Sequence, residues 1–129
     1  MLQDFRTFDV TDPFGRTWHA EFRWHQNAIS IRHADAVDVK YYLAGPEEKR
    51  ELVLALGHPD LLQLAAAAGR DLSDAWLIRL AGLHVQHMIS TWTDMESTLV
   101  GVSAADLARY NSELDQVAAA ERRRAQLTH

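Results

Sequence analysis

The sequence predicts an α+β fold, in which an N-terminal antiparallel sheet of three or four strands packs against three or four C-terminal helices. β-branched and aromatic residues alternate with polar ones up to Ala44, Gly45 and Pro46, and Leu and Ala predominate after them. The chain has 129 residues, 47% of them hydrophobic and 24% charged, which is typical of one globular domain. We therefore expect a single domain over residues 1–129, with strands over about 5–43 and helices over about 46–126.

The first two strands are expected to form a hairpin. Residues 5–10 and 17–25 flank a segment in which Asp12, Pro13 and Gly15 each favour a turn. In the second strand apolar side chains alternate with polar ones, so one face is expected to be buried and the other exposed to solvent. The residues expected on the buried face are Trp18, Ala20, Phe22 and Trp24.

Two more strands are expected to complete the sheet. A tight reversal at Gln26 and Asn27 leads into a strand over residues 28–34, and a further strand follows over residues 36–43. Both strands continue the alternation of apolar and polar side chains. Their inward residues are expected to be Ile29, Ile31, Val37, Val39, Tyr41 and Leu43.

Helix start and stop signals follow the strands. Pro46 and the two glutamates after it favour a helix N-terminus, and this segment is expected to be helical up to Gly57. A second helix is expected to start within residues 58–60. It should end at Gly69, for which a positive φ is expected.

The third helix is expected to begin at about Asp74, with Asp71 and Ser73 as alternative N-caps. This helix is apolar over more than half of its circumference, which predicts burial on two sides. A capping-box pattern at residues 93–96 predicts a break near Trp92 and a short helical piece over residues 96–100.

A final helix is expected to begin at the cap signal of residues 103–106. Its apolar stripe is narrow, with residues spaced three and four apart. The stripe consists of Leu107, Tyr110, Leu114 and Val117. We expect this stripe and a free sheet edge to support a two-fold homodimer.

The charge of the chain argues against several classes of partner. A net charge of −5 disfavours nucleic acid and anionic membranes, which require clustered positive charge. The basic run Arg122–Arg124 falls at the end of the last expected helix, where cations interact favourably with the helix dipole; contact with a phosphate or an acidic partner is the alternative. No apolar run has the length of a membrane span and the N-terminus lacks secretion-signal features, so a cytoplasmic location is expected.

Histidine offers the sharpest candidates for chemistry. Common nucleotide-binding, hydrolase, zinc-protease and EF-hand motifs are missing and the chain has no cysteine, so we expect no cofactor and assign no catalytic residue. His84 and His87 lie three residues apart on one helix face and could ligate one divalent ion. On a helical wheel His84 falls at the centre of the apolar stripe, whereas His87 and Asp94 fall at its edge.

The alternative for His84 is a buried side chain that forms a hydrogen bond with a backbone carbonyl or a side chain of the sheet. Zinc sites require three or more protein ligands, and the spacing supports only two here. We therefore expect no metal site, and keep His84, His87 and Asp94 as candidate binding residues.

Aromatic residues and the polar face of the sheet give two further candidates. All tryptophans are expected on the inward side of their elements, and Trp24 and Trp92 could also line a ligand pocket between sheet and helices. The polar face of the sheet mixes both charge signs with aromatic and imidazole rings, which indicates either solvent exposure or contact with another protein. Its residues are expected to be His19, Glu21, Arg23, His25, Ser30, Arg32, Asp38, Lys40 and Tyr42.

From these observations we expect a small cytoplasmic binding or assembly module without catalytic activity, because no nucleophile, base and orienting group can be assembled. The alternative is a metal-dependent or His/Asp acid–base enzyme centred on His84 and His87, completed by Asp94 and a strand histidine at position 19, 25 or 33. A third hypothesis is a regulator that contacts nucleic acid through Arg122–Arg124.

Overall fold

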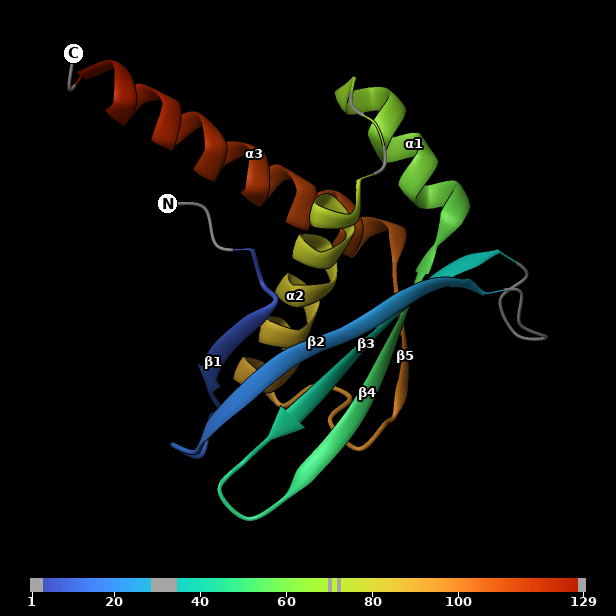
Figure 1. The fold of residues 1–129 in the computed structure, drawn as a ribbon, viewed down its shortest axis with the longest axis vertical. Coiled ribbons are helices and arrows are strands. Elements are labelled where there is room, and N and C mark those ends of the chain that lie inside the picture. Colours follow the sequence, from blue (N-terminus) through green and yellow to red (C-terminus); the bar gives the residue numbers. More distant parts are fainter. Residues whose placement is uncertain (1–3, 29–34, 70, 72, 128–129) are drawn as a thin grey trace.

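The computed structural model describes residues 4–28, 35–69, 71 and 73–127, and it confirms the α+β prediction. The described part of the chain has five strands rather than three or four, and its three helices agree with the expected number (Figure 1). The strands are β1 (Thr7–Thr11), β2 (Thr17–Ala28), β3 (Ala36–Ala44), β4 (Lys49–Gly57) and β5 (Leu99–Val102). The helices are α1 (His58–Ala68), α2 (Asp74–Thr91) and α3 (Ala104–Leu127).

The strands form one sheet in the order β1-β2-β3-β4-β5. The first four pair antiparallel in chain order, whereas β5 pairs parallel to β4. Parallel neighbours need a long crossover, and α1 and α2 lie in the connection between β4 and β5. The sheet is therefore a four-stranded meander extended by a strand from much later in the sequence.

The core lies between one face of the sheet and α2, which runs alongside β1 and β2 (Figure 1). Helix α3 packs in turn against α2 and α1. The buried Tyr41 hydroxyl donates to the backbone oxygens of Phe5, at 2.7 Å, and Ile78, at 3.2 Å, and so ties β3 to both the N-terminal segment and α2. Large side chains with almost no exposure include Trp18, Tyr41, Leu54, Leu56, Ile78, Leu80, Met88 and Ile89.

The helix expected up to Gly57 is wrong, because residues 49–57 form strand β4. Leu52, Leu54 and Leu56 are buried at alternate positions and face the core. Pairing with β3 along the whole of β4 and burial of this leucine row outweigh the helix preference of Leu and Ala, which tertiary packing can override.

Two further local predictions are wrong. Strand β2 continues through Gln26 and Asn27, which pair with Asp38 and Val37, so the chain does not reverse there. The strand expected over residues 28–34 lies, after Ala28, outside the described residues. Instead of a helical piece over residues 96–100, strand β5 begins at Leu99, because its alternate residues Val100 and Val102 are buried in the core.

For the three helices that form, the predicted end signals are confirmed. Gly69 follows α1 with φ 65°, the left-handed conformation expected at this position. Ser73 caps α2 by accepting a hydrogen bond from the Trp76 N–H, and Ser103 accepts one from the Asp106 N–H at the start of α3. Helix α2 ends before Trp92, which has a φ of 58°. Among the described residues, none of the helices combines the length and apolar character that a bilayer crossing requires.

Candidate functional site

The face of the sheet opposite α2 carries the most distinctive cluster of exposed side chains. Trp24, Tyr42 and Leu99 are among the few large hydrophobic residues that are well exposed, at 38%, 38% and 45%. They lie on β2, β3 and β5. We call the surface formed by Glu21, Arg23, Trp24, Lys40, Tyr42, Glu51, Val53 and Leu99 the outer face.

An irregularity in β2 turns Trp24 toward the outer face. Phe22 pairs with Tyr41 and Trp24 pairs with Lys40, so Arg23 is an extra residue that has no partner on β3. Such a β-bulge reverses the alternation of side chains beyond it. Trp24 therefore leaves the buried side that Trp18 and Ala20 occupy, and the prediction that it faces inward is wrong.

Pairing across the sheet brings residues of four strands into one row. Trp24 lies opposite Lys40, Lys40 opposite Val53, and Val53 opposite Leu99. The Lys40 ammonium lies 5.8 Å from the Trp24 ring centroid and forms an ion pair of 3.2 Å with Glu51. Lys40 thus covers part of the indole and leaves the rest exposed.

Tyr42 lies in the neighbouring row of the outer face. It is opposite Glu21 on β2 and Glu51 on β4. The Arg23 guanidinium lies 4.7 Å from the Tyr42 ring centroid and forms an ion pair of 3.2 Å with Glu21. Arg23 therefore packs on the Tyr42 ring, and together with Trp24 these residues form one continuous exposed surface.

A groove of about 980 Å³ runs along the outer face and is lined by residues of β2, β3, β4 and the segment 95–99. Trp24, Val53 and Leu99 supply its apolar surface, and Ser97 and Thr98 add polar groups. Three cations and three carboxylates also line it, namely Lys40, Lys49, Arg50, Asp38, Glu51 and Glu96. The groove combines aromatic surface with balanced charge.

The remaining residues of the expected polar face separate into different environments. His19 remains exposed and its Nδ1 lies 2.7 Å from the Asp9 carboxylate on β1. The bulge turns His25 the other way, so that its Nε2 lies 3.3 Å from Asp74 at the start of α2. Ser30, Arg32 and the candidate strand histidine His33 lie outside the described residues.

His84 is buried, and its partner is neither a backbone carbonyl nor a sheet side chain. Its Nδ1 lies 2.7 Å from the Tyr110 hydroxyl of α3, and its Nε2 is buried without a hydrogen-bond partner among the described residues. Burial lowers the pKa of His84, because the charged ring loses its hydration there. At neutral pH His84 is therefore an uncharged ring held against α3.

His87 and Asp94 do not complete a site with His84. The ring centroids of His84 and His87 are 6.1 Å apart, and Asp94 lies beyond the end of α2. Within the described ranges, no three histidine, aspartate or glutamate side chains converge so that they could hold a metal ion. The two histidines remain on one helix face, as the spacing predicted.

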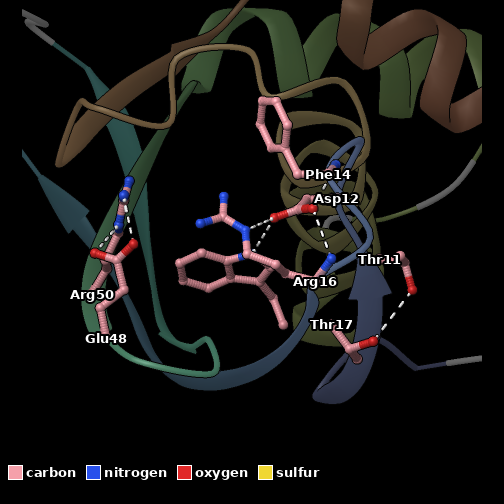
Figure 2. A network of polar contacts seen from close by, with 8 residues as sticks. Thr11, Asp12, Phe14, Arg16, Thr17, Glu48 and Arg50 are labelled. Carbon is pink, nitrogen blue, oxygen red and sulfur yellow. Dashed lines mark hydrogen bonds and ion pairs between the residues drawn. The ribbon is translucent and has the colours of Figure 1, made fainter.

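The turn between β1 and β2 holds a polar cluster that the sequence pattern did not reveal. The buried Asp12 carboxylate accepts hydrogen bonds from the backbone N–H groups of Phe14 and Arg16, at 2.8 and 3.0 Å. It also accepts from Arg16 Nε at 2.7 Å and from Trp18 Nε1 at 3.0 Å (Figure 2). Trp18 was expected to be buried, and a buried indole N–H needs a hydrogen-bond acceptor. This requirement was the one feature of the sequence that pointed to a nearby polar group such as Asp12.

Trp92 belongs to this same end of the molecule. Its ring centroid is 5.8 Å from that of Trp18, and the guanidinium groups of Arg16 and Arg50 lie 4.8 and 5.5 Å from it. Arg50 is held by Glu48, at 3.0 Å, and donates to the Met95 backbone oxygen. These arginines stack on the two indoles, an arrangement that stabilises the end of α2.

The apolar stripe of the last helix is largely used within the chain. Leu107, Tyr110 and Leu114 are buried, whereas Val117 is exposed. Arg122–Arg124 lie in the exposed last turns of α3, which project from the rest of the molecule (Figure 1). Any contact that this stripe makes with another molecule is therefore restricted to its C-terminal half.

Comparison of the chain with protein-family models, with curated proteins and with solved structures gave no match.

Proposed function

We propose that this protein is a cytoplasmic, non-catalytic binding module that recognises a folded protein through its outer face, and that this partner is a second copy of the chain. The observation that carries the proposal is the exposure of Trp24 and Tyr42 in neighbouring rows of the outer face, with the Lys40 ammonium 5.8 and 5.3 Å from their ring centroids. The β-bulge at Arg23 accounts for the outward position of Trp24. The aromatic surface thus results from a specific departure from regular strand geometry.

The residue types on the outer face support a protein partner. Tryptophan, tyrosine and arginine are the residues that most often dominate the binding energy of protein interfaces. All three occur here as neighbours, as Trp24, Tyr42 and Arg23. Lys40 lies against the Trp24 ring and Arg23 lies against the Tyr42 ring. Both rings are therefore already held in place, and little conformational entropy is lost when a partner covers them.

The balance of charge favours a second copy. A two-fold interface brings the same patch of both copies together, so a patch that carries both signs can pair its cations with carboxylates of the other copy. The groove has equal numbers of cations and carboxylates. A polyanion such as nucleic acid would meet Asp38, Glu51 and Glu96, which repel it.

Light scattering of the purified chain over a range of concentrations tests this proposal. We expect the wild type to approach twice the 14.6 kDa mass of one chain, and Trp24→Asp to remain at the mass of one chain. The new carboxylate would lose its hydration in the interface, which is unfavourable. Leu99→Lys, on another strand of the same surface, should have the same effect.

Leu62→Asp is the matched control, because Leu62 is also an exposed apolar residue but lies on α1. This variant should associate like the wild type, and thermal melts should show that all variants are folded. A wild type that stays at the mass of one chain at every concentration would rule out the second copy as partner. A dimer that persists in Trp24→Asp would rule out the outer face.

A further inference from the structure

A groove of about 310 Å³ lies between α2 and α3 beside β1, in the helical layer. It plays no part in the outer face. Its lining includes five polar or ionisable residues of the two helices besides Tyr110: Gln86, His87, Ser90, Arg109 and Glu113. The buried Tyr110 hydroxyl contacts both His84 and Arg109.

Hydrogen-bond donors in this groove are free. Arg109 uses Nη2 to reach both the Tyr110 hydroxyl, at 3.3 Å, and Asp106, at 3.2 Å. Its Nε and Nη1 have no partner within the described part of the chain, and the same is true of the His87 ring nitrogens. Arginine only donates hydrogen bonds, and the Arg109 side chain is half exposed, so these N–H groups are available to an acceptor that enters the groove from solvent.

The Tyr110 hydroxyl also has a proton to donate. Its oxygen accepts from Arg109, and the bond with His84 Nδ1 can run in either direction. If Tyr110 donated to Nδ1, the proton of His84 would sit on Nε2 as a buried N–H without a partner, which is rare in proteins. With the proton on Nδ1, Nε2 is a buried acceptor without a partner, which is less rare than a buried donor without one. We therefore assign the proton to Nδ1, so that His84 donates to Tyr110 and the tyrosine O–H must donate elsewhere.

We propose that the groove between α2 and α3 binds a small oxyanion, a carboxylate or a phosphate group, which accepts hydrogen bonds from Arg109 and from the Tyr110 hydroxyl. His84 is a positioning residue in this site: it donates no hydrogen bond to the anion and fixes the direction of the tyrosine O–H. His87, whose ring lies at the same groove, supplies a further donor.

The surrounding charges limit what can bind. The two carboxylates of Asp106 and Glu113 outnumber the single positive charge of Arg109. Long-range electrostatic attraction of an anion is therefore absent, and binding depends on short hydrogen bonds within the groove. This excludes a polyanion and favours a ligand that presents one anionic group.

Nuclear magnetic resonance titrations at neutral pH test the proposal with two probes, inorganic phosphate and acetate. Ionic strength is kept constant with sodium chloride, so that chloride serves as the control anion. We expect saturable shifts of the amides in residues 86–90 and 109–113. The probe that binds more tightly identifies the phosphate or the carboxylate as the preferred group.

Arg109→Gln and Tyr110→Phe should each weaken binding of the preferred probe at least about tenfold, because each removes a donor to a charged acceptor. Arg122→Gln, an exposed arginine of the same helix, is the matched control and should bind as the wild type does. The phenylalanine retains the buried ring of Tyr110, and a thermal melt reports whether the fold is intact.

The ¹⁵N signals of the His84 ring should show the proton on Nδ1. A signal pattern with the proton on Nε2 would overturn the role of the Tyr110 hydroxyl, and with it the proposal. The absence of saturable shifts with both probes, or equal affinity in Arg109→Gln, would also overturn it.

Discussion

Asp12 shows how a single carboxylate organises a whole turn. Its side chain has no exposure, and it joins the backbone of Phe14 and Arg16 to the side chains of Arg16 and Trp18. Burial on its own raises the pKa of Asp12, but the hydrogen bonds from Trp18, Arg16 and Phe14 outweigh burial and lower it to about 2. The carboxylate is thus more stable as an anion in the folded chain than in water.

We predict that Asp12→Asn lowers the melting temperature at neutral pH, because the amide NH₂ would face the N–H donors of Arg16 or Trp18. A lowered pKa stabilises the fold above the ordinary pKa of aspartate, and this contribution is lost as the pH falls through about 2. The difference between wild type and variant should therefore shrink as the pH falls from about 4 to about 2. Thermal melts followed by circular dichroism measure it.

Asp9→Asn is the control for this prediction. Asp9 is exposed on β1, and within the described part of the chain its carboxylate pairs only with the exposed His19. Its replacement should change the melting temperature little. An Asp12→Asn variant that melts like Asp9→Asn at neutral pH would contradict the role assigned to Asp12.

Single residues also show what the sequence could predict about the candidate sites. The helical wheel predicted that His84 is buried and that His87 lies at the edge of the apolar stripe, and both are confirmed. The partner of His84 was not predictable, because it comes from α3 and depends on how two helices pack. Trp24 was placed on the wrong face, because strict alternation contains no sign of an extra residue at Arg23.

Among the elements, the three observed helices were all predicted, whereas strands β4 and β5 were each predicted to be helical. Gly69, Ser73 and Ser103 act through local backbone geometry, so their effect is visible in the sequence alone. Strand β4 is stabilised by pairing with β3 and β5 rather than by the preferences of its own residues. Its local sequence pattern therefore led to the wrong prediction of a helix. Strand β5 was missed for the same reason, since its partner lies far back in the chain.

The bulge in β2 leads to a prediction about a deletion. Removing Arg23 should leave Phe22 opposite Tyr41 and Trp24 opposite Lys40, now in a regular ladder, with every side chain of β2 on its present face. We expect a folded variant whose free energy of unfolding falls by about 1 kcal/mol, from loss of the exposed contact between Arg23 and Tyr42. Chemical denaturation measures this change.

Deletion of Lys40 is the matched control, because β3 is paired regularly with β4 on both sides of this residue. That deletion should move the residues on one side of it to the opposite face and prevent folding. If deletion of Arg23 is as damaging as deletion of Lys40, Arg23 is not the extra residue of a bulge.

On the scale of the whole molecule, β5 is a short edge strand that few backbone hydrogen bonds hold in the sheet. It has four residues, lies at the edge of the sheet and, among the strands that the structure describes, pairs only with β4. We predict that the amides of β5 exchange with solvent faster than those of β2 and β3, because short edge strands open without unfolding the rest. Hydrogen exchange followed residue by residue checks this, and equal protection in β5 and β3 would contradict it.

The parallel pairing of β4 with β5 has a consequence during synthesis of the chain. The meander β1–β4 can form as soon as it has left the ribosome, but Leu54 finds its partner Val100 only after both α1 and α2 have been made. Until then the edge of β4, with its row of buried leucines, has unpaired backbone groups and can pair with another nascent chain. Slow translation between Gly57 and Leu99 should therefore increase aggregation, whereas slow translation after Val102 should not.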